Sequence, residues 1–110
     1  MYNLGHIYFY NKFGNQDLNK SIEFLYKSYT NGFYISFKLL CLVIYTKIKS
    51  FTIDYISKEI GEYGNDKNIS EICDFIQNFK SESFYQNIYS NFKDIEFVYD
   101  YELKPAVLSS

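Results

Sequence analysis

The sequence of 110 residues has few of the side chains on which many enzymes and metal sites depend. It contains one histidine, His6, so a catalytic relay of histidines or a site with several histidine ligands is excluded within the chain. Cys41 and Cys73 lie 32 residues apart, and neither has a second cysteine or a histidine at metal-ligand spacing. We interpret both as small buried hydrophobic residues in a reducing compartment; a disulfide or a reactive thiol is the alternative.

Arginine is absent, and all 11 basic residues are lysines interspersed with 13 acidic residues. The formal net charge is −2 and the pI is near 5.3. Proteins that bind phosphate backbones need a basic surface, and guanine edges are commonly read by arginine. The sequence therefore predicts no nucleic-acid binding.

Long hydrophobic runs are also missing. The most apolar stretch, residues 33–45, has 13 residues with Lys38 among them, which is too short to cross a bilayer. The first ten residues lack the charged region and cleavage site of a secretory signal. We expect no membrane insertion and favour a cytoplasmic location.

No enzyme motif is found either. Glu71 and Asp74 are spaced as neighbours on one helical face, where exposure to solvent is the default interpretation. A general acid or base would need a buried pocket that raises a carboxyl pKa, and the sequence cannot reveal one. We expect no catalytic residues, no metal site and no cofactor.

Hydrophobic material is abundant, since 47% of the residues are apolar and 22% aromatic, so the chain should fold. Helical periodicity dominates and predicts six helices, near residues 1–10, 18–31, 33–47, 53–63, 68–79 and 81–92. Asp17 is suited to cap the second helix and Gly32 to end it. The third helix is apolar nearly all round and should be the most buried. Asn68 and Glu71 are spaced as a capping box at the start of the fifth.

The C-terminal tail, residues 94–110, has a different period. Apolar and other side chains alternate from Ile95 to Leu103, which is typical of a half-buried strand. A single strand without a partner is unstable, so the tail is a continuing helix, an extended segment lying on the helices, or an edge that pairs with another chain. Pro105 ends regular structure in each case.

The spacing of several residues near the N-terminus forms a pattern of its own. Leu4 and Gly5 precede an aromatic residue, Tyr8, and part of this stretch has an echo at Leu40, 36 residues later. In these positions the chain resembles the Sel-one-like repeats, which are relatives of the tetratricopeptide repeats. Over residues 4–44 the positions that correspond to the repeat pattern are Leu4, Gly5, Tyr8, Asp17, Lys20, Ser21, Phe24, Ser28, Gly32, Ser36 and Leu40.

The resemblance implies an all-α fold of antiparallel helix pairs, a short solenoid of about five or six helices. Residues 1–93 would form the helical region, recognisable as repeats over 1–48 and degenerate over 49–93, followed by the extended tail 94–110. Physical reasons support the pattern: Leu4 and Tyr8 share a face and should fill the groove between helices, while Gly5 and the small serines allow close approach. In the family repeat the first helix normally begins several residues before the Leu-Gly pair, whereas here only three residues precede Leu4. The resemblance therefore implies a fragment or the end of a longer array.

The function that this resemblance implies is a scaffold or adaptor that binds a protein or peptide partner. The candidate contact residues are the non-pattern positions of the first helices, where His6 should face solvent or a partner: His6, Phe9, Tyr10, Lys38 and Tyr45. Packing of these residues on a neighbouring repeat that is missing from this chain is the alternative. Two further functions stay open: a small helical domain that self-associates through its C-terminal tail, and a regulatory repeat region of a larger enzyme.

Overall fold

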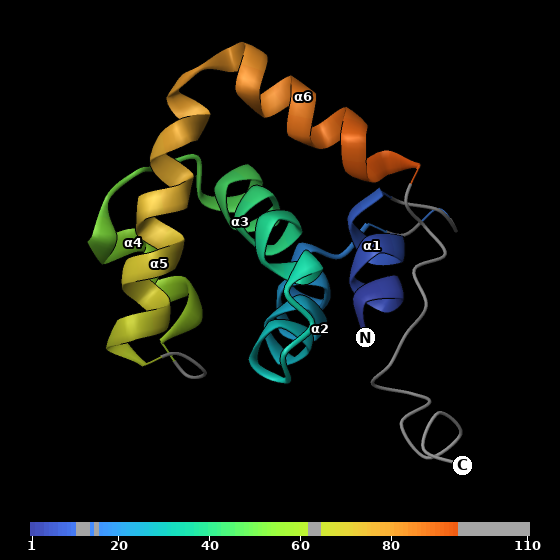
Figure 1. Ribbon diagram of the computed structural model, residues 1–110, viewed down its shortest axis with the longest axis horizontal. Helices are drawn as coiled ribbons and strands as arrows, with labels where there is room; N and C mark the ends of the chain where they lie inside the picture. The colour runs from blue at the N-terminus through green and yellow to red at the C-terminus, as the bar shows by residue number, and fades with distance from the viewer. Residues whose placement is uncertain (11–13, 15, 62–64, 95–110) are drawn as a thin grey trace.

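The computed structural model describes residues 1–10, 14, 16–61 and 65–94, and within these residues every regular element is a helix (Figure 1). The expected all-α fold is therefore confirmed, and each of the six predicted helices is present. The elements in chain order are α1 (Tyr2–Tyr10), α2 (Leu18–Thr30), α3 (Ile35–Ile48), α4 (Ile53–Ile60), α5 (Asp66–Ile76), the short 3-10 helix η1 (Gln77–Lys80) and α6 (Glu82–Lys93). The sequence left the conformation of the tail, residues 94–110, open. Of these residues the structure describes only Asp94.

The predicted signals at both ends of α2 are confirmed. The Asp17 side chain accepts a hydrogen bond of 3.0 Å from the backbone N–H of Lys20, so it satisfies one of the amides that a helix start leaves open. After the helix, Gly32 has φ of +95°, a conformation that other residues adopt only with strain. The chain turns at this glycine and enters α3.

The first three helices pack at close range through small side chains. A Cβ placed on Gly5 would lie 2.4 Å from Cγ of Leu25 on α2, so only glycine fits there without displacing its neighbour. The Ser21 hydroxyl donates a hydrogen bond of 2.7 Å to the Gly5 carbonyl oxygen. Between α2 and α3, the Ser28 and Ser36 hydroxyls are 2.6 Å apart. The expected role of these small residues in close helix packing is confirmed.

Leu4 is an exception to the predicted packing. Its side chain is 43% exposed, so the expectation that it fills the groove between helices is wrong. The short α1 turns Gly5 toward α2, and with Gly5 facing Leu25 the adjacent Leu4 points away from the contact. Tyr8 does reach α2, where its ring stacks on Phe24 with centroids 5.9 Å apart.

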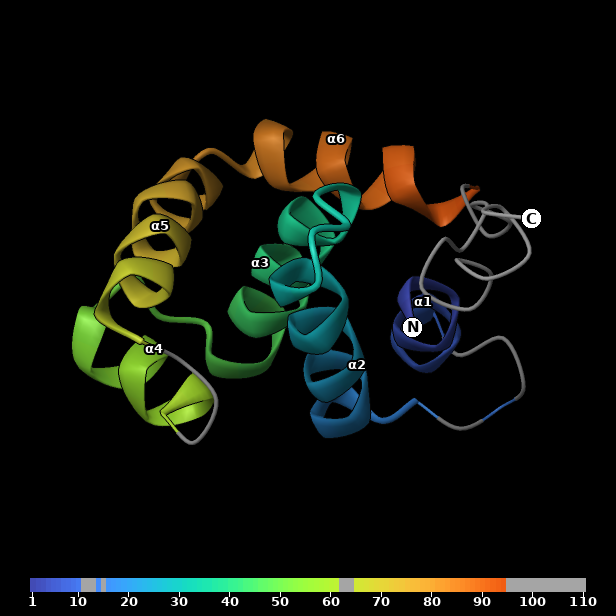
Figure 2. The same ribbon diagram turned by 60° about the horizontal axis from the view of Figure 1, so that its bottom comes forward.

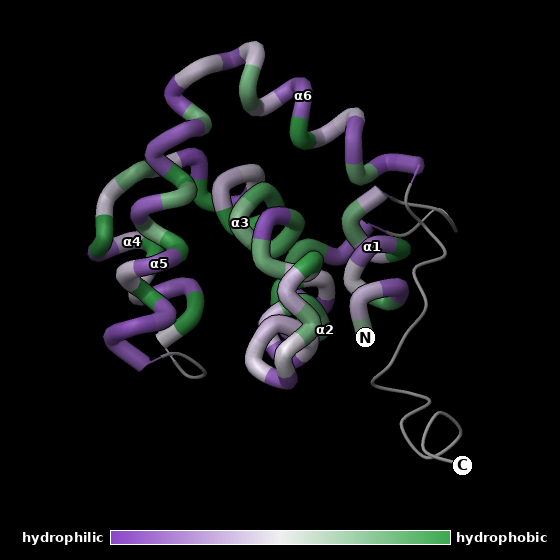
Figure 3. Tube along the Cα trace, in the orientation of Figure 1, coloured by the Kyte–Doolittle hydropathy of each residue, from purple (hydrophilic) through white to green (hydrophobic). Residues whose placement is uncertain are grey.

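Helix α3 lies at the centre of the molecule, as its apolar sequence predicts. Every residue from Leu39 to Ile44 has an exposed fraction of 0%. Figure 3 shows hydrophobic residues along much of α3, whereas hydrophobic and hydrophilic residues alternate on α5 and α6. Helices α2, α4, α5 and α6 all contact α3, so it is covered on several sides. The predicted most buried element is confirmed.

Helix α5 begins earlier than its sequence pattern suggested. The side chain of Asn65 accepts a hydrogen bond of 2.9 Å from the backbone N–H of Asn68, so Asn65 is the N-cap. The predicted capping box of Asn68 and Glu71 is wrong, because both residues lie inside the helix. Their side chains are free to face α2 instead, and both contact Tyr29 there.

Helix α6 returns across the molecule to α1 (Figures 1 and 2). Nε2 of His6 donates a hydrogen bond of 2.6 Å to the Phe92 carbonyl oxygen, and the Tyr10 hydroxyl donates one of 2.7 Å to that of Tyr89. In a linear solenoid each repeat contacts only its neighbours, whereas these bonds join residues 86 and 79 positions apart. The repeat architecture stays a prediction.

Membrane crossing requires a long apolar helix, and no helix in the described part of the chain meets that requirement.

Candidate functional site

Three of the five predicted contact residues lie in the interface between α1 and α6. His6 is 0% exposed and Phe9 is 2% exposed, so the expectation that they belong to an open surface is wrong. Tyr10 is half-buried, and its ring lies 5.1 Å from that of Tyr89. The physical reason is that α6 packs on this face of α1, which the sequence pattern had suggested would be open.

The other two predicted contact residues occupy different parts of α3. Lys38 is exposed. Tyr45 is half-buried and stacks on Phe51 and Phe79, with ring centroids at 5.1 and 5.4 Å. Tyr45 therefore packs within the chain, and the alternative of packing on a further repeat outside it stays untested. The five residues do not form one surface.

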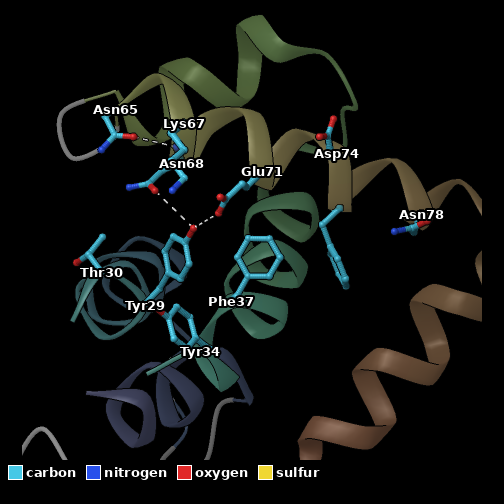
Figure 4. Close-up of a pocket in the computed structure, with 11 residues that line it drawn as sticks. Tyr29, Thr30, Tyr34, Phe37, Asn65, Lys67, Asn68, Glu71, Asp74 and Asn78 are labelled. Carbon is cyan, nitrogen blue, oxygen red and sulfur yellow. Dashed lines mark hydrogen bonds between the residues drawn. The ribbon is translucent and has the colours of Figure 1, made fainter. Parts of the chain in front are cut away.

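A groove of about 970 Å³ lies elsewhere, between the α2–α3 turn and one face of α5 (Figure 4). Tyr29 and Thr30 come from the end of α2, while Tyr34 and Phe37 come from the start of α3. The opposite wall belongs to α5 and η1. Its residues are Asn65, Lys67, Asn68, Glu71, Asp74, Phe75 and Asn78.

Aromatic rings form one side of the groove. Phe37 is central: its ring centroid lies 5.2 Å from that of Tyr29 and 5.5 Å from that of Phe75. Tyr34 stands at the edge with 75% of its surface exposed, the largest fraction among the exposed hydrophobic side chains of the described chain. Figure 4 shows Tyr29, Tyr34 and Phe37 on the α2–α3 side, across from Glu71. The groove thus offers ring surface to a ligand.

Polar groups form the other side. The Tyr29 hydroxyl donates a hydrogen bond to Glu71 and lies 3.5 Å from Oδ1 of Asn68, as the dashed lines in Figure 4 show. The Asn68 amide in turn donates to the Tyr26 hydroxyl at 2.8 Å. Burial raises the pKa of Tyr29 well above 10.0, and the Glu71 carboxylate adds to the increase. Tyr29 therefore stays a neutral donor and fixes the position of Glu71.

Asp74 and Asn78 continue this polar wall along α5 and η1. Both side chains are exposed, and no ion pair of Asp74 is found among the described residues. Asn65, Asn68 and Asn78 carry amides that can donate and accept at once, as a peptide backbone requires. Asn65 already accepts one bond as the N-cap, and Asn68 bonds to Tyr26 and Tyr29, so both have part of their capacity left for a ligand. The wall can therefore bond to an extended chain and can attract a cation.

Comparison of the chain with known protein families, curated proteins and solved structures finds no match. The resemblance of residues 4–44 to Sel-one-like repeats therefore stays a prediction that rests on the residues themselves.

The remaining reactive side chains do not assemble into a second site. Within the described residues, no group of three or more histidine, cysteine, aspartate or glutamate side chains could hold a metal ion. Cys41 and Cys73 are buried free thiols, as predicted, and burial raises the pKa of both. Because the thiolate is the nucleophile, both thiols are held in their less reactive form.

Sequence reasoning missed the groove, although part of its signal is visible. Asn68, Glu71, Asp74 and Asn78 recur at steps of three and four, and Glu71 and Asp74 were recognised as neighbours on one face. An aromatic pair, Phe33 and Tyr34, directly follows Gly32. What the sequence does not contain is the placement of α5 opposite the α2–α3 turn, since that depends on contacts between helices distant along the chain.

Proposed function

We propose that the chain is a protein-interaction scaffold or adaptor that binds an extended peptide segment in the groove between the α2–α3 turn and α5. The observation that carries this proposal is the groove itself, with its volume of about 970 Å³ and its aromatic side facing a polar one. Ligand sites commonly combine apolar walls with a few polar groups that fix orientation. The groove has both.

The exposed Tyr34 is the strongest single indication of an interface. Its side chain makes no capping hydrogen bond at the start of α3, and 75% of its surface is accessible to solvent. Tyrosine is enriched among the residues that carry most of the energy of protein interfaces. Covering Tyr34 with a ligand would remove more apolar surface from water than covering any half-buried neighbour.

The dimensions of the polar wall suit a short peptide. At about 1.5 Å per helical residue, the axis from Asn65 to Asn78 is about 20 Å long. An extended chain rises about 3.3 Å per residue, so about six residues of a ligand would span this wall. Amides at Asn65, Asn68 and Asn78 are then spaced along the path of the ligand backbone.

The resemblance to Sel-one-like repeats supports the same class of function. Gly5, Ser28 and Ser36 stand at positions of the repeat pattern where small residues are expected, and each lies in a close contact between helices. Repeat proteins of stacked helices bind partners on faces that neighbouring helices build together. The proposed groove is also built by more than one helical hairpin.

The experiment that tests this function is a selection of displayed random peptides of about six to eight residues on the purified chain. Enriched peptides are synthesised, and their affinities are measured by fluorescence anisotropy. With Tyr34→Ala we expect about tenfold weaker binding, because an interface anchor is lost. The matched control is Tyr55→Ala on α4, where an exposed tyrosine (61%) lies outside the groove; it should leave the affinity unchanged.

Two outcomes contradict the proposal. One is a selection that enriches no peptide above the background of an unrelated protein. The other is a set of peptides whose affinity responds equally to Tyr34→Ala and Tyr55→Ala. Circular dichroism of both variants should match the unmodified chain, because neither side chain is buried.

A further inference from the structure

We propose that the groove recognises a lysine or arginine side chain of the docked segment, which lies over the ring of Phe37 while its charge faces Glu71, with Asp74 adding negative charge one turn further along α5. This inference rests on the proposed function, since it names the chemistry of the segment that the groove binds. It depends on three features of the described groove: the ring surface, two carboxylates that form no ion pair with a described residue, and the position of Lys67.

The ring surface is suited to a long cationic side chain. A lysine or arginine packs its aliphatic stem along apolar surface, and its charge is attracted to ring faces within about 6 Å. The chain uses this contact twice on its own surface, since Nζ of Lys20 lies 5.4 Å from the Tyr8 ring centroid and Nζ of Lys80 lies 5.6 Å from that of Phe51. No described cation of the chain occupies the Phe37 ring in this way.

The carboxylates supply the charge. Glu71 and Asp74 are three positions apart on α5, so they lie on the same helical face. Figure 4 shows Glu71 directed toward the aromatic side of the groove, whereas the Asp74 side chain, also part of the lining, points away from the rings of Tyr29 and Phe37. The two ion pairs found among the described residues join Lys27 with Glu23 and Lys47 with Glu59, and neither involves these carboxylates. Since no described lysine forms an ion pair with either carboxylate, a ligand cation would meet their negative charge.

An acidic ligand is the competing occupant, because Lys67 also lines the groove. Lys67 lies near the start of α5, one helical turn away from Glu71. The N-terminus of α5 is already capped by the Asn65 side chain, and Asp66 lies in its first turn. These groups reduce the attraction of that end for an anion. Negative charge prevails along the rest of the wall, which favours a cation.

The test continues from the selected peptides. We expect lysine or arginine to be enriched at one fixed position, and replacement of that residue by norleucine, which keeps the stem and removes the charge, to weaken binding about fivefold to tenfold. Asp74→Asn should weaken binding of the lysine peptide about threefold to fivefold and leave the norleucine peptide unchanged. Asp54→Asn, an exposed aspartate on α4 outside the groove, is the charge-matched control.

Salt provides a second measurement on the unmodified chain. Binding of the lysine peptide should weaken as NaCl rises from about 0.05 M to about 0.5 M, whereas binding of the norleucine peptide should change little. Glu71→Gln keeps an oxygen that can accept from Tyr29, so it removes charge while the hydrogen bond to the groove wall stays possible. It should reduce this difference in salt dependence.

The outcomes separate this inference from the proposed function. Peptides that lose affinity with Tyr34→Ala but show no cationic position, and do not respond to Asp74→Asn, overturn the charge recognition and leave the docking function standing. Enrichment of acidic residues, with affinity lost in Lys67→Gln, overturns it in favour of an anionic ligand. A selection that yields no groove-dependent peptide overturns both.

Discussion

The close contact between α1 and α2 at Gly5 makes a prediction whose size can be worked out. In Gly5→Ala the new Cβ would lie 2.4 Å from Cγ and 2.7 Å from Cδ2 of Leu25. Leu25 is 0% exposed, so its side chain is enclosed and would have to move among packed neighbours. Either the leucine leaves its rotamer or α1 moves outward, and the second change would stretch the Ser21 hydrogen bond to the Gly5 carbonyl.

The opposing effects can be compared. Overpacking costs about 1 to 3 kcal/mol and a weakened hydrogen bond about 1 kcal/mol, while the higher helix propensity of alanine returns about 1 kcal/mol. We therefore expect Gly5→Ala to lower the free energy of unfolding by about 1 to 3 kcal/mol. Urea titration followed by circular dichroism measures this change, and the slope of the transition should stay the same.

A double-mutant cycle identifies the cause. Leu25→Ala alone should cost about 2 to 5 kcal/mol, because it leaves a cavity in the core. In that background Gly5→Ala no longer meets the leucine, so it should be neutral or stabilise the protein by up to about 1 kcal/mol. An equal cost of Gly5→Ala in both backgrounds would refute the steric explanation, and an increase in stability of the single variant would refute the close contact.

Two further predictions concern buried polar side chains. His6→Leu removes the side-chain donor of the Phe92 carbonyl, which keeps the backbone N–H of Asp94 as a donor. The free energy of unfolding should fall by about 1 to 3 kcal/mol, and amide hydrogen exchange should accelerate more in α6 than in α2. Uniform acceleration would contradict the link to α6. Burial raises the pKa of Tyr10 and Tyr29 above 10.0. The folded state therefore favours their neutral form, so the stability that these two tyrosines contribute is constant below about pH 9 and is lost as the pH rises beyond about 10. The loss should be less steep in Tyr10→Phe. Urea titrations between about pH 8 and about pH 11 measure it, and an equal slope in Tyr10→Phe would contradict it.

Local signals in the sequence predicted the helices well. Asp17 and Gly32 mark the two ends of α2 because a cap and a left-handed turn depend only on adjacent backbone. The continuous apolar run in α3 predicted its central position, since a helix without a polar face must be covered on all sides. Gly5 was recognised as a point of close approach because it lacks a Cβ and corresponds to the glycine of the repeat pattern.

Relations between distant helices were not predictable in this way. His6 was expected at the surface because helical spacing shows which residues share a face, but not which face another helix covers. The partner of His6 is a carbonyl 86 residues away. The groove was not predicted for the same reason. Tyr29 and Glu71 are 42 residues apart in the sequence, and they meet only when α5 packs beside the end of α2.

The contact between α1 and α6 also determines when α1 can form its last hydrogen bonds during synthesis. His6 leaves the ribosome long before Phe92, which is 86 residues further along the chain. At about 5 to 20 residues per second, Phe92 is added about 4 to 17 s after His6. During this interval α2 and α3 can already pack on α1, but His6 and Tyr10 lack the carbonyl oxygens of α6 to which they donate.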